Sequence, residues 1–185
     1  MSPVKYDFNL LVSCPWGEHA RPRSEILNIL SEIGDETPNV EMTLARGIIG
    51  VKTTLDARSV IQALRSLSEK KPVIRRTLKW VPIDLWTNSD IDSIKEGVRR
   101  LRERIGPNEI WRMTVEKRRY TGLHTIDIIK EAAELIAQKV DLKNPNKILR
   151  IDLIGNHAGI IVLKPDEISA KMSILFGVWK LEIKI

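Results

Sequence analysis

The chain has 185 residues, a length that suits one large domain or two small ones. Apolar residues make up 43% and charged residues 29%, which allows a packed core and argues against wholesale disorder. A single cysteine, Cys14, excludes an intramolecular disulfide framework and a cysteine-based zinc site, and no apolar run approaches the ~18 residues of a membrane span. The first residues, MSPVKYDFNLL, lack the apolar core of a signal peptide, so we expect an intracellular, cytoplasmic protein without a membrane partner.

The positive charge is concentrated in the middle of the chain. The formal net charge is +6, and residues 72–123 hold twelve basic and seven acidic residues. Residues 1–71 are balanced at nine of each sign, and residues 124–185 hold nine basic and eight acidic residues. Such a concentration indicates a phosphate-binding surface, although a solvated helix face beside a charged strand edge gives the same count.

The first half of the chain predicts a small α+β unit. Its expected elements are, in order, a strand over 8–14, a helix over 24–33, two strands within 40–55 around Arg46-Gly47, a helix from Asp56 to just before Pro72, and a strand over 74–81. The order strand–helix–strand–strand–helix–strand is the split βαβ pattern. It predicts a ferredoxin-like domain.

The second half alternates helices and strands again. We expect a helix over 89–105 that begins at Ser89, a strand over 109–115, a helix over 125–140, and strands over 147–154 and 159–163 with Gly155-Asn156-His157 at the tip of their hairpin. Residues 171–185 end in strict apolar–polar alternation, with apolar residues at Trp179, Leu181, Ile183 and Ile185. This tail therefore predicts a strand that needs a sheet edge.

No familiar catalytic pattern occurs in the sequence. It lacks a G-x-G-x-x-G fingerprint, a Walker A loop and an H-E-x-x-H motif. His19, His124 and His157 are too scattered to predict a metal site, and Cys14 ends an apolar strand, where a thiol is usually buried and inert. We therefore expect no catalytic residue, no metal, no cofactor and no enzymatic activity.

The stretch VDLKNPNKILRIDLIGNHAGIIVL, residues 140–163, resembles the end of a THUMP domain. The preceding segment WRMTVEKRRYTGLH, followed by a helix, is also similar to that family, and so is the ferredoxin-like unit placed before it. The resemblance implies an α/β (α+β) protein with an N-terminal ferredoxin-like domain over 1–84 and a THUMP domain over 85–170. The tail over 171–185 lies outside it.

The resemblance also implies a function. THUMP proteins bind RNA, and the family docks on the acceptor end of tRNA. Without a recognisable catalytic domain, the chain is most similar to a standalone adaptor that presents tRNA to a separate ATP- and acetyl-CoA-dependent RNA cytidine acetyltransferase. Three alternatives stay open: a diverged tRNA-modification enzyme, the RNA-binding component of another tRNA-modifying complex, or a protein-interaction module with an incidental basic surface.

The candidate RNA-binding residues are mainly cations. Lys117, Arg118 and Arg119 are consecutive, and a loop at the end of their strand would let them fan out over phosphates, with Tyr120 able to stack on a base. A solvated loop is the alternative. Arg75, Arg76 and Lys79 are expected where the two domains meet, lining a groove or pairing with acids. The full set of candidates is Lys117, Arg118, Arg119, Tyr120, Arg75, Arg76, Lys79, Arg112 and His124.

Overall fold

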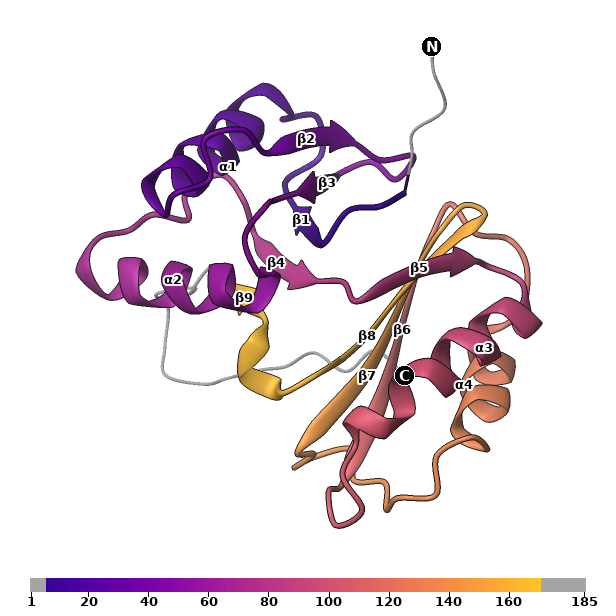
Figure 1. The fold of residues 1–185 in the computed structure, drawn as a ribbon. Coiled ribbons are helices and arrows are strands. Elements are labelled where there is room, and N and C mark those ends of the chain that lie inside the picture. The colour runs from indigo at the N-terminus through magenta and orange to yellow at the C-terminus, as the bar shows by residue number, and fades with distance from the viewer. Residues whose placement is uncertain (1–5, 171–185) are drawn as a thin grey trace.

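The computed structural model describes residues 6–170. These residues form two β-sheets, and their α-helices lie on the two outer sides, so that the strands stand between α1 and α2 on one side and α3 and α4 on the other (Figure 1). Within residues 6–170, no helix combines the length and apolar character that crossing a bilayer needs. The predicted tail strand over 171–185 lies outside the described residues.

The first sheet is ferredoxin-like, as the sequence predicts. Its elements are β1 (Leu10–Ser13), α1 (Ala20–Glu32), β2 (Asn39–Met42), β3 (Ile48–Lys52), α2 (Ala57–Lys70) and β4 (Lys79–Pro82). The strand order is β2-β3-β1-β4, and every pair is antiparallel. Gly47 turns the chain into β3 at a φ of 75°, and a Cβ there would lie 2.9 Å from the Cys14 carbonyl oxygen, so this turn requires glycine.

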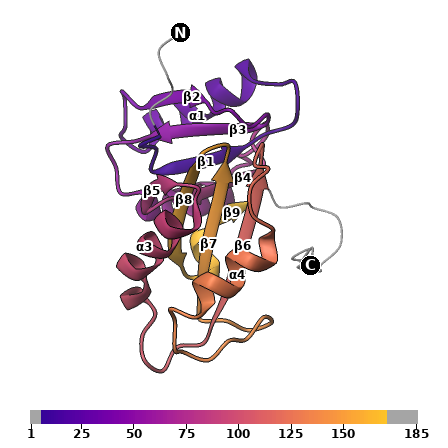
Figure 2. The same cartoon turned by 90° about the vertical axis from the view of Figure 1, so that its right-hand side faces the viewer.

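The second sheet contains the one parallel strand pair of the described chain. Its elements are β5 (Leu85–Asn88), α3 (Ile91–Leu101), the 3₁₀ turn η1 (Arg102–Arg104), β6 (Trp111–Arg118), α4 (Thr125–Ala133), β7 (Lys147–Ile154) and β8 (His157–Leu163). The order is β5-β8-β7-β6, with β6 parallel to β7, and both helices pack on one face (Figure 2). After β8, the turn η2 (Pro165–Glu167) leads to β9 (Ser169–Ala170), which pairs with β4 and so returns the chain to the first sheet.

Each sheet buries one face against its own helices. In β1, Leu10 and Val12 point into the core beneath α1 and α2, and in β7, Leu149, Ile151 and Leu153 do the same beneath α3 and α4. The alternation along each strand turns the remaining residues toward the other sheet. There a smaller apolar cluster joins the two halves, made of Leu11, Ala45, Ile48, Ile83 and Ile154.

Several predicted boundaries are wrong. Helix α1 begins at Ala20, four residues before Ser24, and Asp90 rather than Ser89 caps α3, its carboxylate accepting the Ser93 N–H at 2.9 Å. Helix α4 ends at Ala133 instead of 140, and β4 begins at Lys79 instead of 74. Strand β5 was not predicted, because Trp86-Thr-Asn-Ser-Asp has the composition of a loop.

The division into domains at 84 and 170 stays a prediction. Asp84 lies between β4 of the first sheet and β5 of the second, which is where the predicted boundary falls. Residues 169–170, placed by the prediction in the second domain, pair with the first sheet.

Candidate nucleic-acid interface

The predicted cluster at Lys117, Arg118 and Arg119 straddles the end of β6. Lys117 and Arg118 are the last two residues of the strand, so the prediction of a loop is wrong for both of them. Arg119 follows with a φ of 50°, the left-handed conformation that turns the chain out of the sheet. Because successive strand residues face opposite sides, the three cations do not share a surface.

Arg118 points into the space between the sheets. One terminal nitrogen lies 2.8 Å from an Asp152 carboxylate oxygen, and the side chain is 26% exposed. Arg150, only 4% exposed, pairs with the same carboxylate at 2.6 and 2.9 Å. Burial disfavours the charge of Asp152, yet the two guanidinium groups outweigh it and hold the pKa of that carboxyl below its ordinary value. Arg118 is therefore an anchor of the second sheet as well as a cation.

Lys117 and Tyr120 pack on each other beside that anchor. The Lys117 ammonium lies 5.3 Å from the centre of the Tyr120 ring and donates to the Leu123 carbonyl oxygen at 2.8 Å. The Tyr120 hydroxyl donates to the Ser89 carbonyl oxygen at 3.2 Å and accepts the Leu123 N–H at 3.0 Å. Both side chains thus have a fixed place, and Lys117 remains exposed.

Arg119 and His124 face outward near this end of β6. Both are exposed, and His124 is the N-cap residue of α4 without a side-chain capping bond. Arg119 makes no side-chain hydrogen bond or ion pair with residues 6–170, so its guanidinium can meet an outside anion without losing an internal partner.

Lys79 occupies the junction of the two sheets. It lines a narrow space there together with Arg118, Arg150 and Asp152. Burial, together with the charge of Arg150, lowers the pKa of the Lys79 ammonium. The prediction that this residue lies where the two halves meet agrees with its position.

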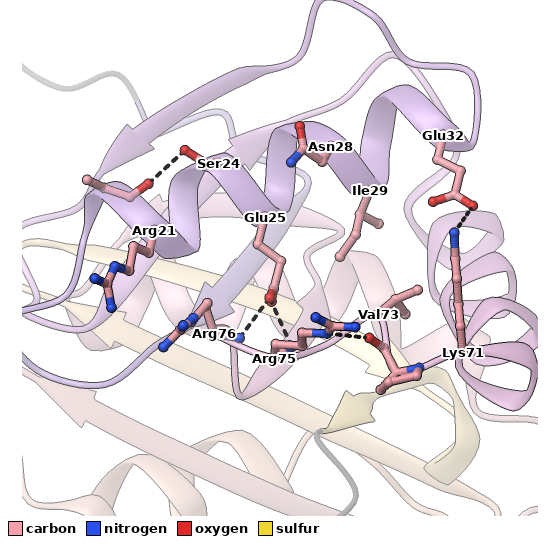
Figure 3. A pocket seen from close by; sticks show the side chains of 12 residues that line it. Arg21, Ser24, Glu25, Asn28, Ile29, Glu32, Lys71, Val73, Arg75 and Arg76 are labelled. Atoms are coloured by element: carbon pink, nitrogen blue, oxygen red, sulfur yellow. Dashed lines mark hydrogen bonds and ion pairs between the residues drawn. The ribbon is translucent and has the colours of Figure 1, made fainter.

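Arg75 and Arg76 lie elsewhere, and the prediction that they line an interdomain groove is wrong. They lie in the loop between α2 and β4, on the wall of a groove of about 560 Å³ whose other wall is α1 (Figure 3). The groove belongs to the first sheet and its helices. It is lined by Ala20, Arg21, Ser24, Glu25, Asn28, Ile29, Glu32, Lys71, Pro72, Val73, Arg75 and Arg76.

Glu25 shapes the loop that carries these two arginines. Its carboxylate accepts the backbone N–H groups of Arg75, Arg76 and Thr77 at 2.9, 2.7 and 2.8 Å, and the Thr77 hydroxyl at 2.7 Å. The negative charge of Glu25 is thus directed at the backbone. The Arg75 side chain lies along the groove and donates from Nε to the Pro72 carbonyl oxygen at 3.0 Å, while Arg76 points away from it (Figure 3). Across the groove, Lys71 pairs with Glu32 at 2.7 Å.

Arg21 was not among the predicted site residues, although it lines the same groove. It is exposed on the first turn of α1, and in Figure 3 it extends toward the same end of the groove as Arg76. A helix start placed at Ala20 would have put Arg21, Ser24 and Asn28 on one polar face. The expected start at Ser24 left Arg21 in a loop.

Arg112 is separated from the other candidates. It lies near the opposite end of β6 from Arg118 and donates to the Leu142 carbonyl oxygen at 3.2 Å. Burial lowers the pKa of its guanidinium. The structure therefore gathers Lys79, Lys117, Arg118, Arg119, Tyr120 and His124 around one end of β6 and leaves Arg112 outside. Nor does the described part of the chain bring three or more metal-ligating side chains together.

Comparison with known proteins finds no matching family model and no matching curated protein. Solved structures do match. PH1313 from Pyrococcus horikoshii Ot3 has a TM-score of 0.62 and 17% identity over 84% of this chain and 54% of that chain. A 4-thiouridine synthetase in complex with RNA and ATP has a TM-score of 0.50 and 14% identity over 85% of this chain and 41% of that chain. SMU.472, described as a putative methyltransferase complexed with SAH, has a TM-score of 0.53 and 11% identity over 86% and 42%.

These similarities define the fold class. The chain has an α/β fold in which a ferredoxin-like unit is followed by a second four-stranded α/β unit, and this is the fold that the sequence resemblance predicts. It spans about half the length of the structures that it matches.

The expectation that the chain has no enzymatic activity is contradicted. Besides SMU.472, two further matching structures are described as a predicted DNA methylase and a possible methylase. The fold thus recurs in proteins described as enzymes, and the lack of a familiar motif in this sequence does not separate the chain from them.

Proposed function

We propose that this chain binds tRNA as the RNA-binding part of a tRNA-modifying enzyme or complex. The observation that supports the proposal best is a band of cations that crosses from the first sheet to the second, on a fold shared with an RNA-bound 4-thiouridine synthetase. The band starts at Arg21, Arg75 and Arg76 in the groove and continues through Lys79 to the end of β6.

The band has no large gap along the chain. Arg76 and Lys79 are three residues apart, a span of at most about 10 Å. Lys79 and Arg118 line the same narrow space between the sheets, and Arg119 follows Arg118 where the chain turns out of β6, while Lys117 lies on the other face of that strand. Spaced cations of this kind suit the phosphates of a folded RNA, which is recognised largely by its shape.

We expect this chain to bind the RNA, and we expect the groups that carry out the modification reaction to belong to the enzyme or complex as a whole. A 4-thiouridine synthetase in complex with RNA, a protein described as a DNA methylase and one described as a possible methylase share its fold, which supports a nucleic-acid-modification role in general over one particular reaction. The narrower form, an adaptor that presents tRNA to a separate RNA cytidine acetyltransferase, rests on the sequence resemblance. It predicts that adding the chain stimulates acetyl-CoA- and ATP-dependent acetylation of tRNA by such an enzyme.

Titration of the purified full chain with tRNA at several salt concentrations tests the proposal. We expect log K to fall linearly with log salt, with a slope of about −0.7 to −0.9 for each phosphate contact. Absence of binding, or binding that does not change with salt, would exclude a phosphate-contacting RNA surface.

A further inference from the structure

Asp84 lies at the point where the chain passes from the first sheet to the second. Its carboxylate is 6% exposed and meets four donors. Arg58 of α2 forms a two-pronged pair with it at 2.8 and 3.1 Å, Arg104 of η1 approaches at 2.7 Å, and the Val162 N–H of β8 donates at 3.2 Å.

The donors to Asp84 come from both halves of the molecule. Arg58 belongs to a helix of the first sheet, whereas Arg104 and Val162 belong to the second. Arg58 also donates to the Val162 carbonyl oxygen at 2.9 Å and lies 3.4 Å from the Glu167 carboxylate. The guanidinium of Arg58 therefore contacts Asp84 between the two sheets, strand β8 and the turn η2. Hydrogen bonding to Asp84 raises the pKa of Arg58, which keeps it charged.

We propose that Asp84 and Arg58 are positioning residues that fix the orientation of the two sheets and thereby align the two ends of the cation band on tRNA. The apolar cluster between the sheets holds the two sheets together, but hydrophobic contacts are non-directional and do not fix the angle between them. A two-pronged guanidinium–carboxylate pair adds a defined angle, because its two parallel hydrogen bonds form in one geometry only. The inference rests on the proposed function for its RNA part, while the orientation itself is a property of the free protein.

The sign of the effect on RNA binding separates positioning from general electrostatics. Replacing Asp84 by asparagine removes a negative charge, so electrostatics alone predicts equal or tighter binding to tRNA. Positioning predicts weaker binding, because RNA must then restore the alignment that the free protein has lost. Asp166→Asn makes the same chemical change at an exposed residue of η2 and is the matched control. Arg58→Lys removes the two-pronged pair at constant charge.

The experiment measures two quantities on the full chain. Spin labels placed by Ser66→Cys on α2 and Lys130→Cys on α4, in a Cys14→Ala background, report the distance distribution between the two halves without RNA. The affinity for tRNA is measured on the unlabelled variants under conditions where each is fully folded.

We expect Asp84→Asn and Arg58→Lys to broaden the distance distribution and to weaken tRNA binding about five- to tenfold. The control Asp166→Asn should have the distance distribution of the wild type and should bind tRNA no more weakly than the wild type. An unchanged distribution in both variants would overturn the positioning role. A broadened distribution with unchanged tRNA affinity would overturn its link to RNA. If the wild type itself does not bind tRNA, the proposed function fails, while the distance measurement still decides the orientation.

Discussion

The guanidinium of Arg118 lies 2.8 Å from the carboxylate of Asp152, whose side chain is 2% exposed, on the neighbouring parallel strand. This pair joins the last residue of β6 to the interior of β7, where Arg150 holds the same carboxylate. Arg118, which the sequence places in a charged loop, therefore stabilises the sheet. Arg119 differs from it, because its side chain is exposed and remains available to RNA.

Arg118→Gln is expected to lower the free energy of unfolding by about 1.5–3 kcal/mol, the range for hydrogen bonds to charged groups. The loss arises because Asp152 stays buried with one guanidinium partner instead of two. Urea denaturation measures it. Arg119→Gln is the control, since Arg119 is exposed and should leave the unfolding midpoint in place. Equal stability of the two variants would contradict the anchor role of Arg118.

Arg119→Gln should instead weaken tRNA binding by about 1–3 kcal/mol, because an outward guanidinium is free to engage a phosphate with two hydrogen bonds. Glutamine, like arginine, has a long polar side chain, and both residues bear the same cost of the left-handed backbone at position 119. We therefore expect folding to be unaffected. Binding titration gives the value. Arg100→Gln on the exposed side of α3 removes the same charge away from the band. If both variants lose affinity equally, the effect is general electrostatics and Arg119 is no specific contact.

Arg76→Gln should reduce both the affinity for tRNA and its salt dependence. One phosphate contact fewer makes the slope of log K against log salt shallower by about 0.7–0.9. The comparison is with Arg46→Gln, an exposed arginine outside the groove, for which the slope should stay that of the wild type. A slope unchanged by Arg76→Gln would remove the groove from the RNA surface.

Acid should weaken the first sheet through Asp35. Burial disfavours its charge, but hydrogen bonds from Thr53, Thr54 and Thr37 outweigh that effect and hold the pKa of Asp35 below its ordinary value of 3.8. A lowered folded-state pKa means that the stabilisation is complete above pH 3.8 and is lost as pH falls through the folded-state value.

Asp35→Asn should therefore be less stable than the wild type at pH 7 by about 1–3 kcal/mol, and the difference should shrink below pH 3.8. Urea denaturation at pH values from about 2.5 to about 7 follows this difference in the free energy of unfolding. The neighbouring exposed residue gives the control Glu36→Gln, for which we expect no such trend. A constant difference across the whole range would show that Asp35 does not act through its charge.

Much of the fold could be predicted from local sequence. The hairpin of β7 and β8 was predicted because two apolar runs flank Gly155-Asn156, and Gly155 indeed has a φ of 56°. The order of elements in the first half was sufficient for the ferredoxin-like sheet. Strand β5 could not be predicted, because four residues with two polar side chains carry no clear period, and their pairing with β8 decides their conformation.

The candidate site was harder to predict, since it depends on register. Whether Arg118 faces inward follows from the parallel pairing of β6 with β7, which brings Arg118 beside Ile154 and Glu116 beside Asp152. No local pattern contains that pairing. Arg75 and Arg76 were placed in the wrong groove for a similar reason, because the carboxylate that shapes their loop is fifty residues away in sequence.

Ultraviolet cross-linking of the full chain to tRNA, with mass spectrometry of the adducts, identifies the peptides that lie against the RNA. We expect adducts on the peptides that carry the band: residues 20–28, 71–79 and 117–124. Adducts confined to the outer faces of α2 and α3, or none at all under conditions where tRNA is bound, would contradict this expectation.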